Sequence, residues 1–553
     1  MQKLPKYVGD VLNSFDNIRA VTPREGWKGQ WRTLCPNHDD HRPSLSIGLR
    51  EDGIIFMNCF GGCRTDDILE AVGLETKNLF PHGIWSAYQF PLDQNGDALK
   101  FAVKYKDTFR YVIPWVKNNW LTYDGIRWNR DLREAEASEC ARHILRELYK
   151  EAAECKDDEE RKLIGKWAAQ ANKYCSSSVS AILRLARFDR LIRIEKPATL
   201  NSQEYLLNCP NGTVDLRTGI LLPHNPTDLI TLVTATSYPA ETGHEPSWME
   251  IKKNAALWLK CLQEWMEQNK DLIRYLQNIF GYSLTSHIME KLFFLFIGKS
   301  NTGKSTCLDT FTALLGDYAG VVPRTLFKQE RFDRHPAEMA VIEHKRFMTV
   351  SDPETEERMT LKTSLAKSLS GDHFLQVRGM GENFYTIRPE CKFVISCNEE
   401  PRIKDPGDAI WNRLRKIAWG YVIPKREQNR NLFEDLKAEW PWILAWAAQG
   451  SKSWYKTEEI ITPQEVIEDT EEYRKKENPV AEFINECCER AKGVFITNEK
   501  LWDRYNFWIQ DNRKYDEKLS PVNFGHCLGR LGYVSDRRRV EGKFHRGWLN
   551  LKV

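Results

Sequence analysis

The sequence of 553 residues contains no long uncharged apolar run. Its most apolar segments, residues 292–297 and 440–448, fall well short of the roughly 18 residues that a membrane-spanning helix needs. The first residues, MQKLPKYVGDVLNSFDNI, carry charges where a secretory signal peptide needs an apolar stretch. We therefore expect a cytoplasmic protein with no membrane partner.

The chain also has no large excess of charge of one sign. It contains 80 Lys and Arg residues and 77 Asp and Glu residues, which give a net charge of +3. Any affinity for nucleic acid must then come from local basic patches rather than from the overall charge. Hydrophobic residues make up 41% of the chain, which is typical of a folded protein, and the length is enough for about three to four domains.

The fourteen cysteines are spread along the whole chain, so we expect no disulfide framework. Eleven are isolated, and we interpret them as inert structural thiols. The other three form two pairs with a histidine, Cys35-x-x-His38 and Cys59-x-x-x-Cys63. Three thiolates and one imidazole make a closed tetrahedral site, which predicts structural rather than catalytic zinc. His41 is a nearby alternative to His38, with a less suitable spacing from Cys35.

The residues between the two pairs predict a β-hairpin. Residues 44–49 and 53–59 are strand-like and flank the turn Glu51-Asp52-Gly53. The motif CPNHDDHRPSLSI followed by CFGGC resembles the Cys-His-Cys-Cys zinc ribbon of bacterial and phage primases. That resemblance implies contact with single-stranded template DNA. The second pair here is separated by three residues, where the cellular primases have two.

Residues 298–305 match the phosphate-binding motif G-x-x-x-x-G-K-[ST] in full. An apolar run precedes the motif and a helical pattern that stops near Gly316 follows it, which is the strand–turn–helix context that the motif requires. Lys304 is expected to reach the β- and γ-phosphates of ATP, and the Ser305 hydroxyl to bind Mg²⁺. The residues predicted to contact the nucleotide are Gly298, Lys299, Ser300, Asn301, Thr302, Gly303, Lys304, Ser305 and Thr306.

Two further strand-like segments end in polar residues. Asp352 and Glu354 follow the apolar residues 347–350. We assign Asp352 to Mg²⁺ and Glu354 to the attacking water, although the two could exchange roles. Asn398 ends the strand-like residues 391–397 and is suited to orienting that water, or is simply a turn-forming residue.

The order of these motifs, from GKSNTGKST through RFMTVSDPE, KSLSGDHFLQVRG and FVISCNEEPRI to AIWNRLRKI, resembles superfamily 3 helicases, most closely the phage, plasmid and poxvirus primase-helicases. The resemblance implies a compact AAA+-type core that assembles into hexameric rings. It makes Asn398 a sensor and Arg413 the arginine finger that reaches a neighbour's ATP, with Arg415 as the second choice. From the sequence alone, Arg413 could equally be a surface residue on a short helix.

The family also places a DNA-gripping hairpin just after the tripeptide Ser370-Gly371-Asp372. Lys367 and Arg378 are therefore candidate phosphate contacts. The lysine expected at the hairpin tip is not obvious, because residues 379–383 read GMGEN. Either Arg378 makes the pore contact or the hairpin is displaced by a few residues.

The remaining segments are less informative. Residues 84–131 predict a small antiparallel unit with turns at Asn95-Gly96 and Asp124-Gly125, and residues 134–194 predict helices. Near the C-terminus, two or three helices followed by two strands around Glu541-Gly542 outline a winged helix. Its basic wing is suited to duplex phosphates. The candidate contacts there are Arg537, Arg538, Arg539 and Lys543.

We therefore expect a multidomain α/β protein. Its predicted segments are a zinc ribbon (1–83), a β-rich segment (84–131), a mainly helical region (132–284), a superfamily 3 ATPase core (285–450), a helical linker (451–478) and a winged helix (479–553). The expected function is an ATP-dependent DNA helicase, a homo-oligomer that binds single- and double-stranded DNA with ATP, Mg²⁺ and Zn²⁺. It would act with other replication proteins of a phage or mobile element in the cytoplasm of a bacterial host.

Two alternatives remain open at this point. Primer synthesis needs clustered carboxylates that hold two metals, and the closest candidates, Asp93 and Asp97, flank a predicted hairpin turn. An ATP-switched protein that recognises an origin without unwinding DNA would carry the same nucleotide motifs.

Overall fold

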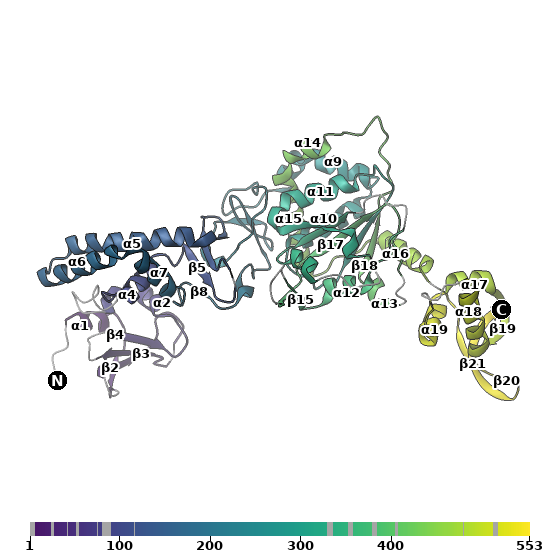
Figure 1. Ribbon diagram of the computed structural model, residues 1–553. Helices are drawn as coiled ribbons and strands as arrows, with labels where there is room; N and C mark the ends of the chain where they lie inside the picture. The colour runs from purple at the N-terminus through teal and green to yellow at the C-terminus, as the bar shows by residue number, and fades with distance from the viewer. Residues whose placement is uncertain are drawn as a thin grey trace. The chain divides into compact units, whose positions relative to one another are not determined.

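A computed structural model describes the chain in thirteen stretches: residues 6–23, 27–40, 42–50, 55–74, 76–79, 90–115, 117–328, 336–351, 358–378, 384–403, 407–478, 480–512 and 518–553. The chain divides into two compact units, which are described separately. The first comprises residues 1–122 and 130–196, and the second residues 123–129 and 197–553 (Figure 1).

The first unit begins with a four-stranded antiparallel sheet in the order β1-β2-β3-β4. Alternate residues of β4 are buried, because one face of the sheet covers a core and the other faces solvent. The predicted hairpin strands are confirmed as β3 and β4. The elements of this module are α1 (Lys6–Leu12), β1 (Arg19–Val21), β2 (Trp27–Thr33), β3 (Leu45–Arg50), β4 (Ile55–Cys59), α2 (Thr65–Ala71) and the 3₁₀ turn η1 (Thr76–Leu79).

The rest of the first unit is mainly helical, as predicted for residues 134–194. Its helices pack on the short strand β5, which pairs with β6 in antiparallel and with β8 in parallel orientation. The elements are α4 (Gln94–Lys104), β5 (Phe109–Val112), β6 (Trp120–Tyr123), α5 (Ala135–Glu154), α6 (Asp158–Lys173), α7 (Cys175–Ala186) and β8 (Arg193–Ile194). Strand β7 (Trp128–Arg130) falls mostly in the second unit.

The predicted turn at Asn95-Gly96 is wrong, because these residues open helix α4. The Asp93 carboxylate caps the helix by accepting a hydrogen bond from the Gly96 N–H at 2.8 Å. Asp97 is buried and accepts a hydrogen bond from the Trp167 indole at 3.2 Å. Burial raises the pKa of Asp97 to about 6. The two carboxylates once considered for metal binding therefore have structural roles in one helix.

The second unit is built around a five-stranded parallel sheet in the order β13-β14-β17-β12-β18. The strands predicted around residues 292–297, 347–350 and 391–397 are confirmed as β12, β14 and β17. The five strands are β12 (Phe293–Ile297), β13 (Ala319–Pro323), β14 (Phe347–Ser351), β17 (Lys392–Cys397) and β18 (Leu414–Ala418).

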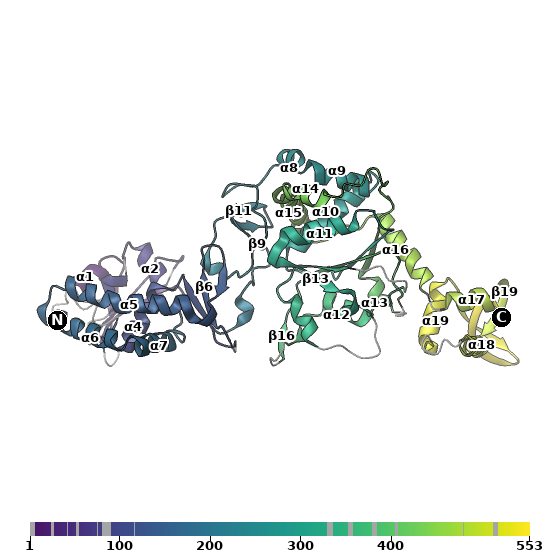
Figure 2. The ribbon, with the colours of Figure 1, turned by 45° about the horizontal axis from the view of Figure 1, so that its top comes forward.

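Helices cover both faces of this sheet, and Figure 2 shows α10, α11 and α15 on one side and α12 and α13 on the other. The side chains of β12 divide between two buried cores, Phe294 and Phe296 facing the first and Phe293 and Leu295 the second. This explains why the strand reads as a continuous apolar run. The helices are α10 (Lys270–Leu284), α11 (Lys304–Leu315), α12 (Thr363–Gly371), α13 (Asp408–Trp411) and α15 (Trp440–Thr457).

Other elements of the second unit precede and follow this core. Asn211-Gly212 and Arg217–Gly219 join the strands of a three-stranded antiparallel sheet. These elements are β9 (Leu206–Cys209), β10 (Gly212–Asp215), β11 (Ile220–Leu222), α8 (Trp248–Asn254), α9 (Ala256–Trp265), β15 (Leu375–Val377), β16 (Tyr385–Ile387), α14 (Leu432–Lys437) and α16 (Gln464–Lys476). None of the described helices combines the length and the apolar content needed to cross a membrane.

The C-terminal segment has its own core and a three-stranded antiparallel sheet in the order β19-β21-β20. Helix α17 ends at Cys487, and a strand that the sequence did not predict begins at Glu489. The two strands around Glu541-Gly542 are confirmed. The elements are α17 (Ala481–Cys487), β19 (Glu489–Thr497), α18 (Asn498–Asp511), α19 (Pro521–Arg530), β20 (Ser535–Val540) and β21 (Lys543–Lys552).

Candidate functional site

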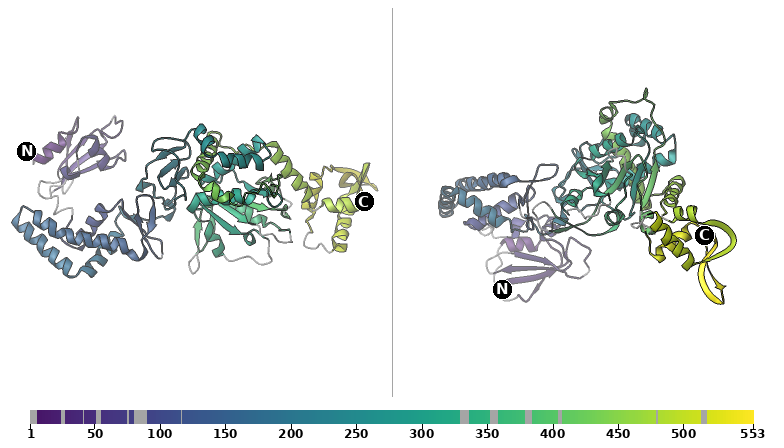
Figure 3. Two further views of the ribbon diagram at one scale, coloured as in Figure 1. Left: turned by 90° about the horizontal axis from the view of Figure 1, so that it is seen from above. Right: turned by 45° about the vertical axis from the view of Figure 1, so that its right-hand side comes forward.

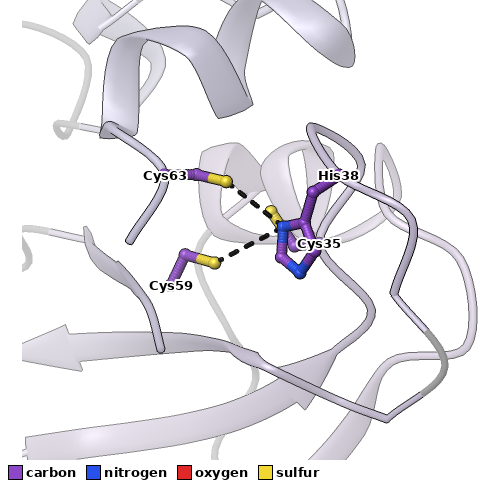
Figure 4. Close-up of side chains that lie close together, drawn as sticks. All are labelled: Cys35, His38, Cys59 and Cys63. Carbon is purple, nitrogen blue, oxygen red and sulfur yellow. Dashed lines mark hydrogen bonds between the residues drawn. The ribbon is translucent and has the colours of Figure 1, made fainter. Parts of the chain in front are cut away.

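Four potential metal ligands converge in the N-terminal module. The donor atoms of Cys35, His38, Cys59 and Cys63 all lie within 4.8 Å of one another (Figure 4). Cys35 and His38 follow β2, Cys59 ends β4, and Cys63 precedes α2. The sheet therefore brings together the two pairs that the sequence separates by 20 residues. His41, the alternative ligand, lies outside the described residues.

The orientation of the His38 ring is fixed by its neighbours. Its Nδ1 atom lies 3.2 Å from Cys63 Sγ and 3.8 Å from Cys59 Sγ, so it is the nitrogen that faces the cluster. Its Nε2 atom lies 3.4 Å from the Ser44 hydroxyl oxygen, and that hydroxyl donates to Asp40 at 2.6 Å. A proton on Nε2 thus points away from the cluster and leaves Nδ1 free to bind a metal.

Asp40 holds this arrangement together. It also accepts the Cys35 N–H at 2.8 Å, which fixes the loop that carries the first two ligands. The Ser44 hydroxyl and the Cys35 N–H hold the pKa of Asp40 well below its usual range. Although burial raises the pKa of Cys59, N–H groups of Cys63 and Gly61 and the Ser44 hydroxyl lower it to about 7. Three thiols and one oriented imidazole in a closed cluster fit a tetrahedral zinc ion.

We expect Asp40→Ala to weaken zinc binding while leaving all four ligands in place. Loss of the carboxylate frees the Ser44 hydroxyl and the Cys35 N–H, and changes of this kind typically cost roughly 10–100-fold in metal affinity. Competition with a chromophoric chelator measures the effect. Asp67→Ala, at an exposed position of α2, is the matched control and should retain full affinity. Equal affinities of the two variants would contradict the role of Asp40.

The second candidate site is the turn between β12 and α11. Gly298 and Gly303 are required there by close packing. A Cβ atom at Gly298 would lie 2.2 Å from the Trp419 carbonyl oxygen, and one at Gly303 would lie 2.2 Å from Trp265 Nε1. Gly303 also has a φ of 87°, which favours glycine. The turn is therefore held against two tryptophans, with the N-terminus of α11 behind it.

Lys304 occupies the turn itself. Its ammonium group donates to the carbonyls of Gly298 at 2.5 Å and Lys299 at 2.8 Å, and to the Thr302 hydroxyl at 3.0 Å. Burial lowers its pKa. No carboxylate neutralises this cation in the contacts described, so it is a partly desolvated positive charge at a helix N-terminus. Such a group has the position and charge to bind an anion.

Asn398 lies beside this turn. Ile297 and Cys397 are register partners in neighbouring parallel strands, so the residues after them meet at the same edge of the sheet. The Asn398 amide lies 3.4 Å from the Ser300 hydroxyl. Asp352 and Glu354 lie outside the described residues.

Arg413 lies at the opposite edge of the sheet. It directly precedes β18, and Phe293, the first residue of β12, donates its N–H to the Arg413 carbonyl at 2.8 Å. Its guanidinium donates to the Ala409 carbonyl at 2.7 Å. The full length of β12 separates it from the turn of its own chain. Arg415 likewise donates to backbone carbonyls, those of Asn412 and Leu414.

The hairpin expected after Ser370-Gly371-Asp372 is present. β15 and β16 pair in antiparallel orientation, with Val377 opposite Tyr385. Arg378 directly follows β15, and its guanidinium lies 5.1 Å from the centre of the Phe384 ring. Lys367 is half-buried on α12. The residues of the expected tip, 379–383, lie outside the described part of the chain.

The basic residues near the C-terminus form a β-hairpin. Arg537, Arg538 and Arg539 lie on β20, and Lys543 opens β21 after a tight turn at Glu541-Gly542. The three arginines lie on two faces of the hairpin, because side chains alternate along a strand. Arg538 points to the opposite face from the other two and pairs with Asp536 at 2.9 Å.

Several residues that support these sites were not found from the sequence. Asp40 and Ser44 lie in the motif CPNHDDHRPS, and their closeness to two ligands was the available clue. Trp265 and Trp419 are remote from the phosphate-binding motif in sequence and carry no comparable clue. Among the described residues, no second group of three metal-ligating side chains was found.

Three family models match separate parts of the chain. "D5 N terminal like" matches residues 98–274, a family of unknown function (DUF5906) matches residues 296–413, and "Poxvirus D5 protein-like" matches residues 475–542.

Two viral proteins are similar in sequence. "Putative helicase L207/L206" of Acanthamoeba polyphaga mimivirus is 24% identical over 333 residues, which cover 57% of this chain and 34% of that protein. "Putative helicase 022R" of Frog virus 3 is 23% identical over 277 residues, or 46% of this chain and 28% of that protein. The chain thus spans about a third of the length of these relatives.

The apo structure of the NrS-1 C-terminal region aligns with 58% of this chain and 86% of its own, at 14% identity and a TM-score of 0.34. Two of the family models and the viral relatives agree with the motifs, and together they support a phage- and poxvirus-type primase-helicase family.

Proposed function

We propose that this protein is an ATP-dependent DNA helicase of the superfamily 3 type that acts in the replication of a phage or mobile genetic element. The proposal rests on the turn from Gly298 to Ser305. At this turn the partly desolvated Lys304 and the N-terminus of α11 lie beside Asn398, at one edge of the parallel sheet. The viral relatives named as helicases support the same reading.

ATP would bind with its phosphates over this turn. The N–H groups at the start of α11 would bind the β-phosphate, and Lys304 would exchange its carbonyl partners for the β- and γ-phosphates. Ser305 and Asp352 would hold Mg²⁺, which supplies charge neutralisation when it is bound. Glu354 would accept a proton from the attacking water and Asn398 would orient that water, which attacks the γ-phosphorus in line with the departing ADP.

The position of Arg413 supports a ring assembly. Arg413 lies at the sheet edge opposite its own turn, which is compatible with a role in stabilising the phosphoryl group transferred at a neighbour's site. We infer a homo-oligomer, a hexamer by analogy with the superfamily, in which hydrolysis depends on assembly. The β15–β16 hairpin, with Lys367 and Arg378, would bind DNA in the pore. The zinc module would contact single-stranded DNA, and the C-terminal hairpin the duplex.

Subunit mixing tests the arginine. We expect Arg413→Ala to lower ATP turnover roughly 10³-fold or more while ring formation persists. Mixing it with Lys304→Ala subunits should restore partial turnover, because the intact lysine of one subunit then meets the intact arginine of the next. Arg415→Ala, the competing assignment, serves as the comparison. If the mixture stays inactive while an Arg415→Ala mixture recovers, Arg415 is the arginine that acts in trans.

Strand displacement on forked DNA tests the motor itself. We expect ATP-dependent displacement that Lys304→Ala abolishes. An origin-binding switch would instead turn over ATP and bind a specific duplex without displacing a strand at any protein concentration. Primer synthesis is the other alternative, and template-dependent oligomers made by Lys304→Ala protein would establish it.

A further inference from the structure

The hairpin of β20 and β21 has two unlike faces. Arg537 pairs with Arg546, and Arg539 with Phe544, so these four side chains project from one face. Trp548 and its partner Ser535 lie on that same face. Arg538 and His545 project from the other. Figure 3 shows the hairpin extending beyond the helices of its own domain.

The face with Phe544 is continuous with the side of the sheet on which helix α19 packs. A Cβ atom at Gly525 of α19 would lie 3.7 Å from the Trp548 ring, which places the helix against this tryptophan. The exposed residues of α19 include no acidic side chain: they are Pro521, Val522, Asn523, His526 and Gly529. The helix and the hairpin therefore border one surface that is neutral along α19 and basic along β20.

Phe544 is the unusual residue of this surface. Its side chain is 65% exposed, although it lies two residues from the turn and among arginines. The Arg537 guanidinium lies 5.4 Å from the centre of its ring. Exposure of an aromatic ring to solvent does not stabilise the folded protein, and the ring cannot bind phosphate. The Phe544 ring lies among cations, so it can stack on a flat apolar surface that is bordered by negative charge. The base pairs of a nucleic-acid duplex, with phosphates on either side, form such a surface.

We propose that Phe544 inserts between base pairs of duplex DNA while Arg537, Arg539 and Arg546 pair with the adjacent phosphates. This inference rests on the proposed DNA-binding role of the hairpin and adds the residue that contacts the bases. Side-chain wedges of this kind unstack one base step and bend the duplex. The three arginines would contribute a salt-dependent part of the affinity, and Phe544 a part that does not depend on salt.

The test uses the full-length protein without nucleotide and a blunt DNA duplex that contains 2-aminopurine, whose fluorescence rises on unstacking. We expect wild-type protein to raise this fluorescence. Phe544→Ala should remove the rise and weaken binding roughly 5- to 100-fold, with the slope of log affinity against log salt unchanged. Phe544→Trp should retain both properties. Arg537→Ala should instead reduce the salt slope by about 1.

Phe507→Ala is the matched control, because Phe507 is 57% exposed on α18 and lies 5.5 Å from the Arg504 guanidinium. It should bind and unstack DNA as wild type does. Wild-type affinity and fluorescence in Phe544→Ala would overturn the wedge and leave the proposed helicase function intact. A failure of wild-type protein to bind any duplex would remove the wedge together with the proposed role of the hairpin.

Discussion

Removal of zinc is expected to unfold the N-terminal module while the rest of the chain stays folded. The module has a small core, to which β3 contributes Leu45, Ile47 and Leu49, and domains of this size usually need a further source of stability. Structural zinc supplies about 10–16 kcal/mol in comparable small sites. Hydrogen exchange followed by mass spectrometry should show the protection of residues 27–79 lost on chelation and restored by added Zn²⁺.

Ligand variants sharpen this experiment. Cys63→Ala should reduce the bound zinc from one ion per chain to nearly none, and its module should exchange rapidly even without chelator. Cys155→Ala, which removes a thiol at the α5–α6 connection, should keep one zinc ion and full protection. A module that stays protected in Cys63→Ala and after chelation would show that the four side chains form an ordinary core.

Lys304→Ala is expected to abolish ATP turnover without unfolding the protein. The ammonium group is the positive charge at the proposed phosphate site, and removal of one group that stabilises transition-state charge costs roughly 10²–10³-fold in rate. Binding of single-stranded and duplex DNA should persist, because the zinc module and the C-terminal hairpin do not involve this residue. Steady-state phosphate release and fluorescence anisotropy with labelled DNA measure the two properties.

Lys260→Ala provides the control for this change. Lys260 is an exposed lysine of α9 that pairs with Glu264, and its loss should leave turnover unaltered. If Lys304→Ala hydrolysed ATP at the wild-type rate, the turn between β12 and α11 would not be the hydrolytic site.

The chain shows which features local sequence can predict. The apolar runs of β12 and β17 are buried on both faces, so their composition alone reveals them. The candidate zinc ligands and the phosphate-binding motif were found because the required residue types lie within a few positions of one another. Asp40 acts through hydrogen bonds to Ser44 and Cys35, and only the folded loop shows those contacts.

The errors have equally local causes. Asn95-Gly96 is a common hairpin turn, but Asp93 caps a helix there and the apolar residues Ala98, Phe101 and Ala102 follow helical spacing. At the C-terminus, β19 was not predicted as a strand, because most of its side chains are exposed and it contains several charged residues. The position of Arg413 at the far edge of the sheet depends on parallel pairing between β12 and β18, which no local pattern reveals.

The proposed nucleotide site is tested most directly by a structure determined with Mg²⁺ and a non-hydrolysable ATP analogue. We expect the triphosphate to lie over residues 298–305, Lys304 to leave the Gly298 and Lys299 carbonyls for the phosphates, and a neighbour's Arg413 to approach the γ-phosphate. A turn that stays empty at saturating analogue, with Lys304 still bound to those two carbonyls, would contradict the proposed site.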